Sequence, residues 1–292
     1  MSRGDKRAVI LAGGISSRMK KSSVDPGVDA ELVRQADERT KGMIGVGEGG
    51  RPFLDYLLNN MKHAGIDDVV IVIAERDTEL RNYYGPRDRG NEFHGMRISY
   101  ALQRIPQGRS KPIGTSDALT QARLSRPDWD GGDFIVCNSD NLYSVRAYTL
   151  LLESDAPNAL IDYDRSGLEF DETRIAQFGI TRKDNDGYVI EIVEKPKMED
   201  LDALRSTDGT IRVSMNIFRL EYATMIGPLL DCPEDPVRHE KELVTAVTNM
   251  VKANPKSLKA LPLKEHVPDL TSKEDIPVTR EYLRKYFATL TW

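Results

Sequence analysis

The sequence predicts an α/β fold, a Rossmann-like and mostly parallel mixed sheet with helices on both faces and a small additional β region. Short apolar runs indicate buried strands at residues 7–12, 67–74, 96–102 and 133–140, and helical patterns separate most of them. Glycines or polar residues follow the first and last runs, at the strand ends where ligands of such sheets gather. After residue 155, alternating apolar and polar residues indicate the additional β region.

The first run, residues 7–12, ends at Gly13 and Gly14, as expected of a buried parallel strand followed by a tight turn. The polar segment 28–40 has helical spacing and predicts an insertion beside this turn, either a mobile flap or a subunit contact. An amphipathic helix follows within 51–65 and ends at a glycine. Its apolar face is formed by Phe53, Leu54, Leu57, Leu58 and Met61.

The second half contains a predicted hairpin within 174–196, whose turn is Asn185-Asp186-Gly187. No repeat or linker divides the sequence, so we expect one domain over 1–292, with a first part at about 1–155 and a C-terminal part at about 156–292. The other predicted elements are a strand at 210–220, helices at 221–231 and 239–253, a strand at 257–263 and a helix at 272–287.

Composition and charge exclude several classes of protein. The chain has 41 lysines and arginines against 46 acidic residues, a net charge of −5, whereas nucleic-acid binders usually carry a basic surplus. Its two cysteines are too few for a disulfide framework, and its four histidines are too scattered for a zinc site. No apolar run is long enough for a signal peptide or a membrane span. We therefore expect a cytoplasmic protein that binds neither nucleic acid nor membrane.

The residues after the first strand are suited to binding an anion. Gly13 and Gly14 let the backbone approach a ligand closely, and a loop that leaves a strand can turn its N–H groups toward that ligand. Ser16 and Ser17 add hydroxyl donors, and Arg18 adds a guanidinium group that fits phosphate. A tight turn without a ligand is the alternative for a glycine pair taken alone.

This loop resembles the G-G-x-G-T-R signature of the nucleotidyltransferases that activate sugar 1-phosphates, with Ser16 in place of the third glycine. Further resemblances follow in the order of that family and cover nearly the whole chain. They are Lys41 in a K-x-L-x-P-V-like segment, Gln103, the turn at Gly114 and Thr115, Asp140 after the fourth predicted strand, the E-K-P sequence at Glu194 and Lys195, Asn216 in a predicted strand, and Asp269 in a late acidic segment.

The resemblance implies a magnesium-dependent transfer of a nucleotidyl group from a nucleoside triphosphate to a sugar 1-phosphate. It implies that Arg18 and Lys41 hold the triphosphate with the Gly13–Ser17 loop, and that Asp140 and Asp269 bind Mg²⁺. It further implies a sugar-binding β region in the C-terminal part. The expected sugar-side and base-side residues are Glu194, Lys195 and Asn216 for the sugar phosphate and its hydroxyls, and Gln103, Gly114 and Thr115 for the nucleobase.

Several alternatives stay open at this stage. The gap between Arg18 and Lys41 is longer than the family's usual spacing, and Lys20 or Lys21 directly follows the loop, as in molybdenum-cofactor guanylyltransferases. A catalytically inert paralogue that binds a sugar nucleotide is a second alternative. The second acid could also come from a helix, where Glu240 and Glu242 are the candidates. The base, the sugar and the oligomeric state stay undetermined, and a homo-oligomer is compatible with the sequence.

Overall fold

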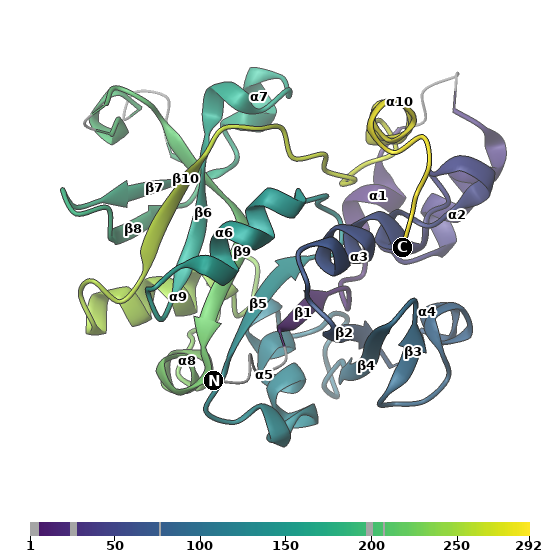
Figure 1. Cartoon of the computed structure of the whole chain (residues 1–292), viewed down its shortest axis with the longest axis horizontal. Coiled ribbons are helices and arrows are strands. Elements are labelled where there is room, and N and C mark those ends of the chain that lie inside the picture. The colour runs from purple at the N-terminus through teal and green to yellow at the C-terminus, as the bar shows by residue number, and fades with distance from the viewer. Residues whose placement is uncertain (1–5, 24–27, 76, 197–200, 207) are drawn as a thin grey trace.

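The computed structural model describes residues 6–23, 28–75, 77–196, 201–206 and 208–292. Ten strands form one sheet in the order β10-β6-β9-β5-β1-β2-β4-β3, and the β7–β8 hairpin branches from β9 (Figure 1). The strands are β1 (Arg7–Leu11), β2 (Asp68–Ala74), β3 (Asn91–Phe93), β4 (Met96–Gln103), β5 (Asp133–Asn138), β6 (Ala159–Asp164), β7 (Gly179–Lys183), β8 (Val189–Val193), β9 (Arg212–Glu221) and β10 (Lys259–Leu263).

The helices surround this sheet on both sides (Figure 1). They are α1 (Ser17–Lys21), α2 (Ala30–Glu38), α3 (Phe53–His63), α4 (Thr78–Tyr84), α5 (Thr115–Ser125), α6 (Val145–Glu153), α7 (Glu172–Ile175), α8 (Tyr222–Leu230), α9 (Leu243–Ala253) and α10 (Asp275–Tyr286). Short 3-10 turns include η1 (Lys41–Met43), η2 (Glu48–Gly50), η3 (Pro127–Trp129), η4 (Arg165–Gly167) and η6 (Asp202–Leu204). None of the helices in the described part of the chain combines the length and apolar character that a membrane crossing needs.

The sheet is mixed and mostly parallel, as predicted. β1 pairs in parallel with β2 and with β5, and β2 pairs in parallel with β4. β9 lies antiparallel between β5 and β6. Because β2 and β5 flank β1 on opposite sides, the strand order reverses at β1, and a crevice at the carboxyl ends of these strands is the usual ligand site of such sheets.

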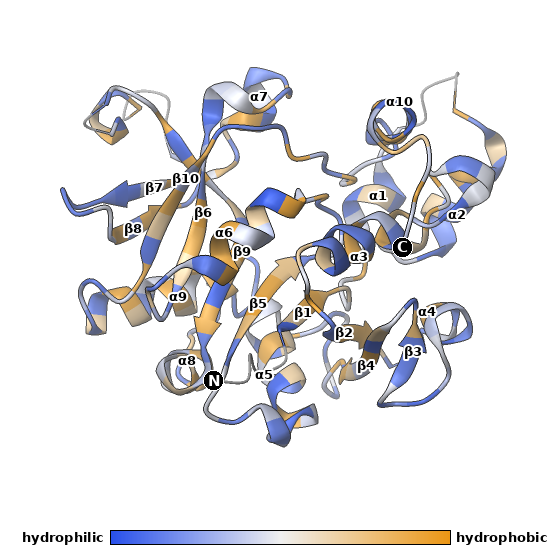
Figure 2. Cartoon of the chain, viewed as in Figure 1, coloured by the Kyte–Doolittle hydropathy of each residue, from blue (hydrophilic) through white to orange (hydrophobic). Residues whose placement is uncertain are grey.

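Successive residues of the central strands face two separate apolar cores, which explains why both faces carry helices. Ile10 and Ile71 belong to one core, to which α1, α2, α3, α4, α6 and α10 contribute, whereas Val9 and Val70 belong to the other, beneath α5, α8 and α9. Figure 2 shows the apolar residues concentrated along the strands and on the helix faces turned toward them. The predicted helices on both faces are therefore confirmed.

Several predicted boundaries differ from the structure by a few residues, and three of them have a clear physical reason. The strand expected at 133–140 ends at Asn138, because the following residues leave the sheet and Asn141 pairs with Asp269. The start of the predicted hairpin, from Arg174, is the short helix α7, which Asp171 caps by accepting a bond from the Arg174 amide at 2.8 Å. The helix expected from 239 begins at Leu243, because the backbone of Lys241 bonds to Ile113 and Ser116 instead.

The predicted insertion at 28–40 contains α2 and is anchored to the rest of the molecule. Leu32 and Ala36 are buried in the first core. The buried Lys273 ammonium pairs with Asp37 at 2.7 Å, and the Lys273 amide donates to the Ser22 hydroxyl at 2.9 Å. A ligand-dependent change in the exposure of this segment stays a prediction.

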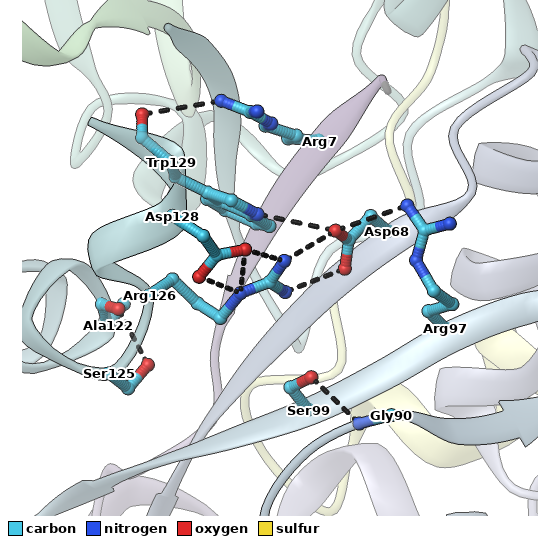
Figure 3. A network of polar contacts seen from close by, with 10 residues as sticks. All are labelled: Arg7, Asp68, Gly90, Arg97, Ser99, Ala122, Ser125, Arg126, Asp128 and Trp129. Atoms are coloured by element: carbon cyan, nitrogen blue, oxygen red, sulfur yellow. Dashed lines mark hydrogen bonds and ion pairs between the residues drawn. The ribbon is translucent and has the colours of Figure 1, made fainter. Parts of the chain in front are cut away.

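At the amino end of β2, Asp68 is the centre of a buried polar network (Figure 3). Its carboxylate accepts two bonds of 2.7 Å from the Arg126 guanidinium, and further bonds from Trp129 and Arg97, each 3.3 Å long. Arg126 also bonds to Asp128 and lies 4.5 Å from the centre of the Trp129 ring. This network joins β2, β4 and η3 at the amino ends of the strands, whereas the crevice lies at their carboxyl ends.

Candidate functional site

A pocket of about 300 Å³ opens at the carboxyl ends of β1 and β5, at the predicted crevice. Its lining comes from the loops after β1, β4 and β5, from η1 and from the start of α5. The structure thus brings together residues separated by more than 100 positions. Ten of the predicted site residues line it: Gly13, Gly14, Ser16, Ser17, Arg18, Lys41, Gln103, Gly114, Thr115 and Asp140.

The loop after β1 has an unusual backbone at the position where the resemblance expects a glycine. Ser16 has φ 55° and ψ 35°, in the left-handed region that glycine adopts most easily. Its carbonyl then accepts the Lys20 amide at 3.1 Å as α1 begins. At Gly13, a Cβ atom would lie only 2.7 Å from Gln103 Oε1, so a side chain there would require the Gln103 amide to move. The loop therefore leaves little side chain between its backbone and the pocket.

Lys41 and Asp140 form an ion pair inside the pocket. The Lys41 ammonium lies 2.7 Å from Asp140 Oδ2, and the two side chains are 11% and 19% exposed. The preceding Thr40 hydroxyl bonds to Asp77 at 2.5 Å, which fixes the entry to η1. Lys20, the competing phosphate lysine, lines an adjoining pocket of about 690 Å³ instead. A buried cation therefore faces the predicted metal ligand.

Asp140 and Asp269 lie side by side although 129 residues separate them in the sequence. Asn141 and Asp269 form an antiparallel bridge, and the Leu270 amide donates to the Asp140 carbonyl at 2.8 Å. Burial raises the pKa of Asp269, and the neighbouring Asp140 carboxylate raises it further. The predicted acid pair is therefore assembled, and it carries like charges that the protein only partly neutralises.

Arg174 holds Asp269 in place, and sequence reasoning missed it. Its guanidinium lies 3.0 Å from Asp269 Oδ2 and also pairs with Asp275, while Thr271 donates to Asp269 Oδ1 at 2.5 Å. Asp275 in turn accepts the amides of Thr271 and Ser272. No sequence motif marks an arginine in a four-residue helix, so only the fold shows this contact.

The acid pair has the chemistry of a Mg²⁺ site. Mg²⁺ prefers oxygen ligands and usually takes one or two carboxylates, with phosphate and water filling the rest of its shell. In the described ranges, no group of three or more His, Cys, Asp or Glu side chains is placed to hold a metal ion. A divalent cation at Asp140 and Asp269 would therefore depend on oxygen atoms of a bound substrate.

Asp269 is absent from the pocket lining, and so are the remaining predicted residues, which lie toward the β7–β8 branch. Glu194 follows β8 and packs against Gly179, where a Cβ would lie 2.9 Å from its carboxylate. Partial desolvation of its carboxylate raises the pKa of Glu194, and the neighbouring Glu242 carboxylate raises it further. Gly179 pairs with Ser214, two residues before Asn216. Lys195 and Asn216 both have positive φ, 46° and 57°, a conformation that is enriched at functional sites.

The two candidates for a helical acid have other partners. Glu242 precedes α9, pairs with Arg238 and is absent from the pocket lining. Glu240 lines the pocket and pairs with Lys111 at 2.6 Å. Lys111, like Arg174, was missed, because it lies in a loop without a recognisable motif. The pocket thus contains three cationic side chains, of which the sequence predicted two.

Comparisons with known proteins show the family and the fold. A family model described as nucleotidyl transferase matches residues 32–260. The bifunctional protein GlmU of Symbiobacterium thermophilum is 27% identical over 165 residues, which are 54% of this chain and only 27% of that protein. The crystal structure of UDP-glucose pyrophosphorylase complexed with UDP-glucose superposes with a TM-score of 0.67, at 15% identity over 96% of this chain and 99% of the other. At this identity the last comparison shows a shared fold.

Proposed function

We propose that this chain, which belongs to the nucleotidyl transferase family, transfers a nucleotidyl group from a nucleoside triphosphate to a sugar 1-phosphate and releases pyrophosphate. The family assignment confirms the resemblance inferred from the ordered motifs. The observation that carries the proposal is the Lys41–Asp140 ion pair beside Asp269, in the pocket formed by the Gly13–Arg18 loop. Both the loop and Asp269 lie outside the residues that the family model matches, so the geometry is a separate argument.

The pocket suits a reaction that depends on positioning and charge neutralisation. In nucleotidyl transfer an oxygen of the incoming phosphate attacks the α-phosphorus while pyrophosphate leaves. Arg18 and Lys41 place two cations beside the loop, and they would bind the triphosphate and stabilise the charge that develops on it. Mg²⁺ bound by Asp140 and Asp269 would supply further neutralisation when present.

The second group of residues lies where an acceptor can approach. Glu194, directly after β8, and Asn216, on β9, would accept and donate hydrogen bonds to sugar hydroxyls. Lys195 would hold the phosphate of the acceptor. Two anions that repel each other would then be held together in one crevice, which is the main contribution of such a site to the rate.

The position of Lys41 also argues against a guanylyltransferase of the molybdenum-cofactor type. In that alternative a lysine soon after Arg18, here Lys20 or Lys21, serves the triphosphate. Lys20 instead lines the adjoining pocket, and Lys41 faces Asp140. We therefore assign the phosphate role to Lys41 and not to Lys20.

The proposal is tested by incubating the protein and Mg²⁺ with each of the four nucleoside triphosphates and a panel of sugar 1-phosphates, with pyrophosphate release as the readout. At least one combination should turn over, and Asp140→Asn should abolish turnover while the protein stays folded. Tight binding of a nucleotide sugar without pyrophosphate release in any combination would instead establish the inert, binding-only paralogue.

A further inference from the structure

Two segments from different halves of the chain form a polar clamp at the rim of the pocket. We define the clamp as residues 104–114 and 234–243. The Lys241 amide donates to the Ile113 carbonyl at 2.7 Å, and the Leu243 amide donates to the Thr115 hydroxyl at 2.8 Å. A Cβ at Gly114 would lie 2.4 Å from the Lys241 carbonyl oxygen. The two segments are therefore packed backbone to backbone.

Two cations of the clamp differ in what they face. Arg109 pairs with Glu234 at 2.9 Å and also bonds to the His239 carbonyl. Lys111 pairs with Glu240 at 2.6 Å and also bonds to the Arg238 carbonyl. Only the second pair lines the pocket; Arg109 and Glu234 are absent from its lining. The clamp therefore contains one ion pair that lines the pocket and one that does not.

On this side of the pocket, the hydrogen bonds within the protein leave one side-chain donor that a ligand can use. The Gln103 amide nitrogen already donates to the Gly114 carbonyl at 2.7 Å and to Asp117 at 3.3 Å, so that Gln103 presents mainly its carbonyl oxygen to a ligand. Lys111 has three N–H donors, of which Glu240 and the Arg238 carbonyl engage two. One donor of Lys111 thus has no protein partner among the described residues, and Lys111 lines the pocket together with Gln103 and Gly114.

We infer that Lys111 donates a hydrogen bond to the base of the bound nucleoside triphosphate, and that Glu240 is a positioning residue that directs Lys111 into the pocket. The inference rests on the proposed function for the identity of the ligand. It commits to the base because Lys111 lies in the same segment as Gly114, whose carbonyl accepts the Gln103 amide, and the family resemblance assigns both of these residues to the base. The same resemblance assigns Arg18 and Lys41, which also line the pocket, to the phosphates. Lys111 is then a residue for nucleotide affinity, separate from the cations that act on the transferred phosphate.

The inference is tested by calorimetric binding of nucleoside triphosphate and, separately, of pyrophosphate to the full chain. Lys111→Met should weaken triphosphate binding about ten-fold or more, the range of a hydrogen bond to a charged group, and leave pyrophosphate binding unchanged. Where turnover is observed, KM for the triphosphate should rise and kcat should stay constant. Lys111→Arg should recover part of the affinity, and Glu240→Gln should show a smaller loss than Lys111→Met.

The matched control is Arg109→Met, which removes the other cation of the clamp. It should leave triphosphate affinity unchanged, and melting temperatures should verify that every variant is folded. An equal loss of triphosphate affinity in the Lys111 and Arg109 variants, or no loss in either, would show that Lys111 only holds the two segments of the clamp together. A parallel loss of pyrophosphate affinity in the Lys111 variant would show that Lys111 contacts the phosphates and not the base. If wild-type protein binds nucleotide but releases no pyrophosphate, the proposed function fails, but the binding measurements still test whether Lys111 contacts the base.

Discussion

Two buried aspartates at opposite ends of the same sheet illustrate how differently one residue type is used. Asp68 accepts bonds from the guanidinium groups of Arg126 and Arg97 and from the Trp129 indole. Asp269 has one arginine and one hydroxyl, and a second carboxylate lies beside it. Burial raises the pKa of Asp68, but Arg126, Arg97 and Trp129 together outweigh it and lower that pKa. The pKa of Asp269 is instead raised.

The difference separates a structural end of the molecule from a candidate functional end. At the amino end of β2 the charge of Asp68 is paired by Arg126 and Arg97, which favours one rigid arrangement. At the carboxyl ends of β1 and β5 the two acids lie side by side, and the arginine that pairs with Asp269 is shared with Asp275. Such an arrangement costs stability in the free protein, and a bound cation and substrate would relieve that cost.

The largest predicted effect on stability is at the amino end. Arg126→Met leaves the Asp68 carboxylate buried with too few partners, and we expect a loss of about 3 to 5 kcal/mol in the free energy of unfolding, measured with urea. The control, Arg97→Met, removes a half-exposed partner and should cost less than about 1 kcal/mol. Nucleotide affinity of the folded fraction should stay at the wild-type value in both. A loss of affinity without a loss of stability would reverse our assignment of the two ends.

The largest predicted effect on catalysis is at Lys41. Lys41→Ala removes the buried cation that faces Asp140, and we expect turnover to fall by about 10² to 10³, the usual effect of removing one group that stabilises the transition state. Lys20→Ala and Lys21→Ala are the controls and should change turnover by less than about ten-fold. The readout is the initial rate of pyrophosphate release. The opposite ranking would favour the guanylyltransferase alternative.

Arg174 should matter for metal affinity more than for the fold. Because it holds Asp269, Arg174→Gln should weaken the binding of Mn²⁺ in the presence of nucleotide by about 10-fold to 100-fold, the usual effect of a residue that orients a metal ligand. Electron paramagnetic resonance of free Mn²⁺ measures this directly. Arg182→Gln, which breaks an exposed ion pair with Glu191 in the same β region, is the matched control. Equal affinities for the two variants would remove Asp269 from the metal site.

The smallest predicted effect concerns the left-handed backbone at Ser16. Ser16→Gly relieves that conformation, but glycine also has more freedom in the unfolded chain, so the two effects nearly cancel. We expect a change of at most about 1 kcal/mol in the free energy of unfolding, toward higher stability, with turnover within about three-fold of wild type. A marked drop in turnover would show that the Ser16 hydroxyl itself contacts the substrate.

Apolar runs allowed most of the fold to be predicted from the sequence, because buried parallel strands such as β1 and β2 consist almost entirely of apolar residues. The ends of elements were predicted less well. The segment before α9, for example, pairs with the loop at 113–116, and no local pattern encodes a partner more than 100 residues away.

The same distinction applies to the candidate site. Residues such as Asp140 and Gln103 follow strands and stand in recognisable sequence contexts, and they line the pocket. Lys111 and Arg174 have their surroundings defined by segments distant in sequence, through Glu240 and Asp269, so that local sequence carries no signal for them. The missed residues are those whose contacts depend entirely on the tertiary fold.

The most direct test of the contrast between the two ends is the pH dependence of the free energy of unfolding, without divalent cations, for wild type, Asp269→Asn and Asp68→Asn. Because the pKa of Asp269 is raised above its ordinary value of 3.8, its stabilising contribution is complete below that value and is lost as the pH rises through the folded-state pKa. For Asp68, whose pKa is lowered, the contribution is present above 3.8 and is lost as the pH falls.

The account predicts that at pH 7 Asp269→Asn is more stable than wild type, by on the order of 1 kcal/mol, and that this advantage disappears as the pH is lowered toward 4. Asp68→Asn should be less stable than wild type at pH 7, and its deficit should shrink on acidification. If Asp269→Asn is instead destabilised at pH 7 in the same way as Asp68→Asn, the acids at the carboxyl end are as fully paired as those at the amino end, and the contrast is wrong.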